Sequence, residues 1–173
     1  MNYSTDNTRI IDRKKVPAPY ELINNLPIND DISKLVYGTR QEISQILHDK
    51  DDRLLVVVGP CSIHDPVSAI EYAKKLIHEN IKFKENLLIV MRVYFEKTRT
   101  TVGWKGLIND PDLNESYKIS KGVEMARKLL IDLAKLNLPA GTEFLDPISP
   151  QYIPDIISWG GLGARTAASL IHR

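Results

Sequence analysis

Cationic and aromatic residues are interleaved in one short stretch of the chain. Its four cations are Arg92, Lys97, Arg99 and Lys105, and a single acid, Glu96, lies among them. Guanidinium and ammonium groups at this density suit a ligand with several anionic groups, because their donors match phosphate and carboxylate oxygens. A solvated basic loop and a nucleic-acid patch are the alternatives, since a run of charge is often only surface.

The basic stretch follows an apolar run at 87–93, which predicts a buried strand. Unusual residues also follow or end the other apolar runs of the sequence. Cys61 comes after the run at 54–58, which we expect to be buried on both faces. Glu143 and Arg165 lie at the ends of weaker strand patterns at 140–144 and 162–165. The candidate chemistry is therefore clustered at strand ends.

Helical patterns separate these strands and also precede the first one. They lie at 17–27, 31–48, 65–80, 119–136 and 150–159, and a last helix is expected from 167. Alternation of this kind predicts an α/β fold with parallel strands and right-handed crossovers. In a (β/α)8 barrel or in an open doubly wound sheet, the site lies at the carboxyl ends of the strands. Four strands are half of such a barrel, so the chain is either a small open sheet or the front half of something longer.

Composition limits the function classes. The chain has 173 residues, 43% of them hydrophobic, and a net charge of +1, which argues against a general nucleic-acid binder. It has no apolar run long enough to span a bilayer, so we expect no membrane partner. A single cysteine excludes an internal disulfide, and a cytoplasmic location is the default expectation.

Four motifs carry a family resemblance: GPCSIHDP (59–66), MRVYFEKTRTTVGWKGLINDP (91–111), GTEFLDPISPQY (141–152) and SWGGLGART (158–166). Together they resemble the N-terminal half of the type I 3-deoxy-D-arabino-heptulosonate 7-phosphate (DAHP) synthases. The resemblance implies the first half of a (β/α)8 TIM barrel with an N-terminal helical extension. It divides the chain into an arm and helix at 1–50 and four β/α units, a truncated barrel, at 51–173.

The resemblance also implies an activity, which is the condensation of phosphoenolpyruvate with erythrose 4-phosphate. This reaction releases phosphate and opens the shikimate pathway to chorismate and the aromatic amino acids. A divalent metal (Mn, Fe, Co or Zn), a homo-oligomer and an aromatic amino-acid inhibitor are implied for the full-length family. Metal binding by this chain is expected to be weak or absent, because the other family ligands lie in the second half.

By the same resemblance, Cys61 matches the metal-ligand cysteine and Glu143 matches a carboxylate near the water that adds to the enol. Lys97 matches the catalytic lysine between the two substrates. His64 lies close to Cys61 but matches no ligand, so we expect it to be structural. The remaining substrate-binding matches are Arg92 and Arg165 for phosphoenolpyruvate, and Arg99 and Thr100 for the aldose phosphate.

The chain departs from the family pattern in two of these motifs. Thr98 stands where the family has a proline that would fix the backbone, and Ala168 stands where it has an acid. Two alternatives to an enzyme are a truncated, non-catalytic remnant and a module that binds a phosphate ligand. We expect residues 1–173 alone to lack turnover and to associate through the strand edges and bare inner face of a half barrel.

Overall fold

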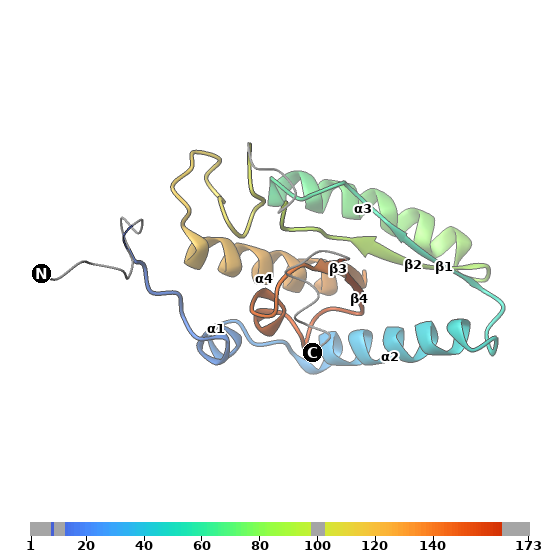
Figure 1. Cartoon of the computed structure of the whole chain (residues 1–173). Helices are drawn as coiled ribbons and strands as arrows, with labels where there is room; N and C mark the ends of the chain where they lie inside the picture. The colour runs from blue at the N-terminus through green and yellow to red at the C-terminus, as the bar shows by residue number, and fades with distance from the viewer. Residues whose placement is uncertain (1–7, 9–12, 98–102, 164–173) are drawn as a thin grey trace, which may run out of the picture.

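The computed structural model describes residue 8 and residues 13–97 and 103–163 of the chain. Its centre is a curled sheet of four parallel strands in the order β1-β2-β3-β4, which is also their order in the sequence (Figure 1). The strands are β1 (Leu54–Val58), β2 (Leu87–Arg92), β3 (Ala140–Phe144) and β4 (Trp159–Leu162). Each strand therefore pairs with the next one along the chain, as in a (β/α)8 barrel.

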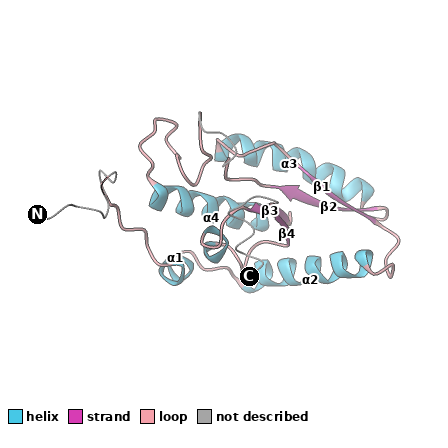
Figure 2. Ribbon diagram, in the orientation of Figure 1, coloured by secondary structure: helices cyan, strands magenta, loops and turns pink. Residues whose placement is uncertain are grey.

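Helices precede the sheet and connect its strands (Figure 2). They are α1 (Pro19–Asn25), α2 (Asp30–Leu47), α3 (Pro66–Phe83), α4 (Ile119–Lys135) and the short 3-10 helix η1 (Ser149–Tyr152). Two of them begin at side-chain caps. The Asn29 side chain accepts a hydrogen bond from the Ile32 amide at the start of α2, and the Asp65 carboxylate accepts bonds from Val67 and Ser68 at the start of α3.

Alternation along β2 buries both faces of this strand. Ile89 and Met91 belong to the main core cluster, to which α3 and α4 contribute apolar side chains. Leu88 and Val90 point the other way and pack in a second cluster with Ile43 of α2. We expected the inner face of the half barrel to be bare. This expectation is wrong for Leu88 and Val90, because α2 covers them.

The first strand differs from the sequence prediction. Leu54 and Val58 at the ends of β1 are 64% and 37% exposed, so β1 is not buried on both faces. The reason is its place at the edge of the sheet, where β2 is its only partner among the described residues. An apolar run shows that a strand is suited to burial, but it does not show whether a neighbouring strand is present.

The segment before β4 also differs. A helix was expected at 150–159, but the structure has only η1, and β4 begins three residues earlier than the predicted 162. Pro154 disfavours a helix, and side chains bind the carbonyls that a helix would use. The Arg40 guanidinium donates to the oxygens of Pro154 at 2.7 Å and Ile157 at 3.0 Å. Arg127 donates to the Tyr152 oxygen at 3.0 Å.

The α/β prediction is confirmed: helices alternate with parallel strands in a curled half-barrel sheet, and α1 and α2 form the N-terminal extension. The predicted strands at 54–58, 87–93 and 140–144 match β1, β2 and β3 to within one residue. The helix expected from 167 lies outside the described residues. In the part of the chain that the structure describes, no helix is both long and apolar enough to cross a bilayer.

Candidate functional site

The ends of β1 and β2 bring Cys61 and Arg92 together. The Arg92 Nη2 donates to the Cys61 carbonyl oxygen at 3.3 Å, and the Ile63 amide donates to the Tyr94 oxygen at 2.8 Å. Gly59 permits this approach, because a Cβ there would overlap the Arg92 backbone oxygen. The Cys61 thiol is exposed and free. The predicted metal ligand and the predicted phosphoenolpyruvate arginine are therefore neighbours at the carboxyl ends of the strands.

The guanidinium of Arg92 packs on an aromatic ring, and one of its hydrogen-bond donors is unsatisfied by the described residues. Its carbon lies 4.0 Å from the centroid of the Tyr94 ring, a close cation–π contact. The Arg92 Nε is buried and has no hydrogen-bond partner among the described residues. A buried donor of this kind is unfavourable unless something accepts from it, so the geometry suits an anionic group placed against Arg92.

Lys97 lies farther along the same segment. Its ammonium is 6.0 Å from the Trp104 ring centroid, and its amide donates to the Lys105 carbonyl at 2.9 Å. The Trp104 Nε1 in turn donates to the Asp110 carbonyl at 2.7 Å. The buried Asp110 carboxylate accepts hydrogen bonds from the backbone amides at 114 and 115. Trp104 and Asp110 thus shape the loop that presents Lys97.

Glu143 is half-buried near the carboxyl end of β3, at the same end of the sheet as Cys61 and Arg92. Its register partner in β4 is Gly161, and a Cβ at Gly163 would lie 3.1 Å from the Glu143 Oε1. The hydroxyl of Tyr94 lies 3.9 Å from the position of a Cβ on Gly161. Tyr94 therefore stands between Arg92 and the strand that pairs with Glu143, and small residues in β4 leave room at that point.

Glu96 is the most perturbed acid of this region. Burial and, after it, the neighbouring Asp146 carboxylate raise the pKa of Glu96 to about 7, against the opposing effect of the hydrogen bond from Asn109. The Glu96 Oε1 accepts from the Asn109 Nδ2 at 3.4 Å and from the Ser149 Oγ at 3.5 Å. Glu96 therefore links the loop that carries Lys97 to the turn that follows β3.

A complete metal centre is not formed by the described residues. They contain no group of three or more His, Cys, Asp or Glu side chains placed to hold an ion. Cys61 offers one exposed thiol, which suits one ligand position. His64 is exposed and makes an edge-to-face contact with Trp104 at 6.5 Å between ring centroids, in keeping with a structural role.

Three predicted binding residues, Arg99, Thr100 and Arg165, lie outside the described residues, as does Thr98. Their predicted roles stay predictions. The structure does bring together Cys61 and Arg92, and it places Lys97 and Glu143 on the adjoining segments of the same edge.

Sequence reasoning missed two contributors to this region. The sequence signal for Tyr94 is its spacing of two from Arg92, which places both side chains on one side of an extended segment. Asp146 carried no signal of its own, because its contact with Glu96 depends on how the turn after β3 folds back.

Comparison with known proteins gives consistent matches. A model of the DAHP synthetase I family matches residues 26–173. The chain is 54% identical over 168 residues to a phospho-2-dehydro-3-deoxyheptonate aldolase of Amycolatopsis methanolica, covering 97% of this chain and 83% of that protein. It is 53% identical over 173 residues to the Phe-sensitive phospho-2-dehydro-3-deoxyheptonate aldolase of Escherichia coli K12, covering 49% of that protein.

A solved structure of phospho-2-dehydro-3-deoxyheptonate aldolase from Francisella tularensis SCHU S4 matches with a TM-score of 0.89 and 53% identity. The match covers 94% of this chain and 48% of that chain. A Trp-sensitive relative from Buchnera aphidicola of Acyrthosiphon pisum is 53% identical, with 98% of this chain and 49% of that protein covered. The chain thus spans about half the length of most of these relatives.

Proposed function

The chain belongs to the DAHP synthetase I family, and from this premise we propose that it provides a substrate-binding face of a DAHP synthase. The reaction joins phosphoenolpyruvate to erythrose 4-phosphate and releases inorganic phosphate, the first step of the shikimate pathway. The observation that carries the proposal is the buried Nε of Arg92 beside Cys61, which has no hydrogen-bond partner in the described part of the chain. A phosphate or carboxylate oxygen of phosphoenolpyruvate would satisfy this donor.

In this proposal the side chains at the strand ends have separate roles. Arg92, and Arg165 beyond the described residues, bind phosphoenolpyruvate, and Lys97 lies between the two substrates. Arg99 and Thr100 bind the phosphate of erythrose 4-phosphate. Glu143 orients the water that adds to the enol carbon. Convergence of two phosphates and a carboxylate requires several fixed cations, since the mutual repulsion of the anions is otherwise unfavourable.

Cys61 supplies one ligand of a divalent metal, which polarises the aldehyde as a Lewis acid when bound. The exposed free thiol fits this role, but one ligand falls short of the three or four protein ligands of a stable site. The resemblance places the remaining ligands in the second half of the family's barrel. Metal binding by residues 1–173 alone is then weak.

Regulation and assembly are proposed from the relatives' names and the fold. Two relatives are named Phe-sensitive and Trp-sensitive, which favours an aromatic amino acid as inhibitor here. We also propose that residues 1–50 act as an extension that covers the sheet while 51–173 form the β/α units. Homo-oligomerisation and a cytoplasmic location complete the proposal.

The test is an assay of phosphate release from phosphoenolpyruvate, with erythrose 4-phosphate and Mn²⁺. Residues 1–173 alone should show no turnover. The same residues joined to the second half of the E. coli relative should release phosphate only when both substrates are present. A folded joined protein without this dependence would contradict the proposal and favour the non-catalytic remnant.

A module that binds a phosphate ligand is the second candidate, because the Arg92 donor that no described residue satisfies lies in this chain itself. Titration calorimetry with phosphoenolpyruvate separates it from the remnant. Binding to residues 1–173 that is lost in Arg92→Ala would support a binding module, whereas a remnant would show no heat of binding.

A further inference from the structure

The Asp146 carboxylate is satisfied at one oxygen and unsatisfied at the other. Its Oδ1 accepts hydrogen bonds from the amides of Ile148 at 2.7 Å and Ser149 at 2.8 Å, which fixes the turn after β3. Its Oδ2 is buried and has no hydrogen-bond partner among the described residues. A buried carboxylate oxygen without a donor is unfavourable, so this atom calls for a proton or a donor close by.

The Glu96 carboxyl lies at the same turn, because Ser149 donates from its amide to the Asp146 Oδ1 at 2.8 Å and from its Oγ to the Glu96 Oε1 at 3.5 Å. Two ionised carboxylates cannot hydrogen-bond to each other, because neither has a donor. One proton between them changes this, since a protonated carboxyl donates to the ionised one. The adjoining cavity, which Glu96, Thr142 and Ser149 help to line, is about 10 Å³ and holds at most one water.

We propose that Glu96 and Asp146 share one proton, and that this proton makes Glu96 a positioning residue for Lys97. Glu96 precedes Lys97 directly, so fixing the Glu96 side chain on the turn after β3 also fixes the backbone that carries the Lys97 ammonium. The catalytic meaning of this contact rests on the proposed function, whereas the shared proton itself does not.

The other charged groups on the segments around this pair are Glu143, Lys97 and Lys105. Glu143 of β3 lines the same small cavity and adds negative charge. Lys97 and Lys105 lie on the same loop as Glu96, where the ammonium of Lys97 is directed to Trp104. The pKa of Glu96 is raised to about 7, first by burial and then by Asp146, which agrees with a carboxyl that keeps its proton near neutrality.

The sign of the pH dependence follows. An acid whose pKa rises from 4.5 to about 7 on folding binds its proton more tightly in the folded state. Its contribution to the free energy of unfolding is therefore full below pH 4.5 and is lost as the pH rises to about 7. Above pH 7 the contact is between two anions, and the loop is released from the turn.

The first experiment is a ¹³C NMR titration of the side-chain carboxyl of Glu96 in residues 1–173. We expect a midpoint near 7, which Asp146→Asn lowers by about one pH unit, because the substitution removes a like charge and provides an N–H donor. The amide of Lys97 should titrate with the same midpoint in the wild type and lose that transition in Glu96→Gln.

Urea denaturation between pH 4 and pH 8 gives a second readout. In the wild type, the urea concentration at the unfolding midpoint should decrease as the pH is raised from 4.5 to 7. In Glu96→Gln this decrease should be much smaller. Glu85→Gln is the matched control, since the Glu85 side chain is 82% exposed, and it should keep the wild-type curve.

Each opposite result overturns the proposal. A Glu96 midpoint near 4.5 would show that Glu96 carries no proton near neutrality. A midpoint near 7 that Asp146→Asn leaves unchanged would show that burial alone raises the pKa of Glu96, and that the two carboxyls share no proton. A Lys97 amide that ignores the titration removes the positioning role. None of these readouts needs a substrate, so failure of the synthase assay would leave them interpretable.

Discussion

The guanidinium of Arg127 binds both carboxylate oxygens of Asp155, at 2.7 Å and 2.8 Å, and its side chain is fully buried. The same guanidinium donates to the carbonyls of Leu26 and Tyr152. A single side chain of α4 therefore ties the linker between α1 and α2 to the segment that leads into β4. This contact positions the last described strand relative to the N-terminal extension.

Asp155→Asn should lower the free energy of unfolding by about 3 kcal/mol, because it leaves a buried cation uncompensated. We place the effect at the low end of the usual range since the Asp155 side chain is 28% exposed. Asp132→Asn is the control on the same helix, where the pair with Lys135 is exposed, and should change stability by less than about 0.5 kcal/mol. Equal urea midpoints for the two variants would contradict the account.

Gly38 and Gly122 form a matched pair of helical glycines. A Cβ at Gly38 in α2 meets nothing within 4 Å, whereas a Cβ at Gly122 in α4 would overlap the carbonyl oxygen of Ile108. Gly38→Ala should therefore stabilise the protein by about 0.5–1 kcal/mol, the difference in helix propensity. Gly122→Ala should destabilise it by about 1–3 kcal/mol through overpacking. Thermal denaturation of both variants checks the opposite signs, and a shift in the same direction would refute the packing at Gly122.

Cys61→Ser tests the proposed metal ligand in the protein completed with a family second half. We expect most metal-dependent phosphate release to be lost, because a hydroxyl is a poor anionic ligand at neutral pH while a metal-bound thiol is deprotonated. Metal content after dialysis is the direct measurement, and partial rescue by excess Mn²⁺ agrees with a weakened site. Wild-type activity and metal content without added metal would exclude Cys61 as a ligand.

Hydrophobic patterns predicted the first three strands and most helices because local periodicity determines them. The ranges 54–58 and 140–144 coincide with β1 and β3, and the first helices agree closely as well. The prediction of a helix at 150–159 was wrong because long-range contacts determine the structure of this segment. Arg40 and Arg127 take carbonyls that a helix would need, and neither is near in sequence.

The predicted start of the fourth strand was wrong for a related reason. Gly160 and Gly161 weaken a strand pattern, so the prediction began after them. In the structure Gly160 leaves space for the Phe144 ring, which a Cβ would overlap. The pairing of β4 with β3 sets its start at Trp159. Small residues at that point are a packing requirement that becomes visible only when the neighbouring strand is in place.

The candidate site was predicted from residue types at strand ends together with a family resemblance. Cys61, Arg92, Lys97 and Glu143 lie at one edge of the sheet, as parallel strands require. The cation–π contact of Tyr94 and the contact between Glu96 and Asp146 were not predicted, because both depend on side-chain orientation.

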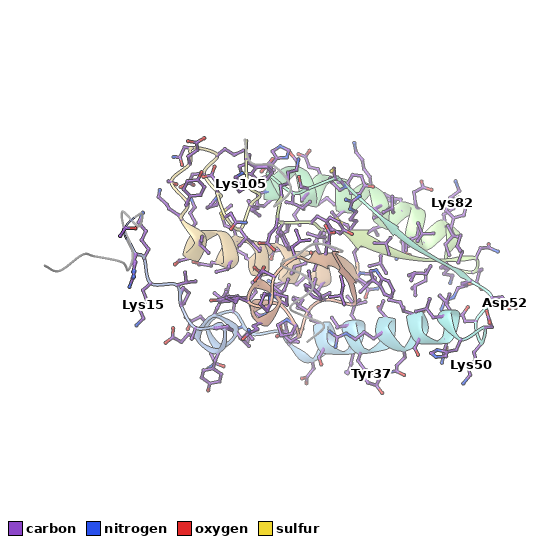
Figure 3. The ribbon with its side chains drawn as sticks, in the orientation of Figure 1. Lys15, Tyr37, Lys50, Asp52, Lys82 and Lys105 are labelled. Carbon is purple, nitrogen blue, oxygen red and sulfur yellow. The ribbon has the colours of Figure 1, made fainter. Side chains whose placement is uncertain are left out.

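The central claim is that Arg92 and its neighbours bind phosphoenolpyruvate. The competing candidate for an anion is a cavity of about 740 Å³ near the start of α4, which Glu115 and four lysines help to line: Lys14, Lys15, Lys118 and Lys121. Lys118 and Lys121 both bind Asp112, which lowers their capacity to hold a further anion. A matched control cation is Lys82, which lies at the far end of α3 from the loop of Lys105 (Figure 3).

Titration of ¹⁵N-labelled residues 1–173 with phosphoenolpyruvate, followed by NMR, tests this claim most directly. We predict shifts at the amides of 59, 61–64 and 92–97, which are lost in Arg92→Ala and kept in Lys82→Ala. Shifts confined to 14–16 and 115–121, or unchanged shifts at 92–97 in Arg92→Ala, would contradict it.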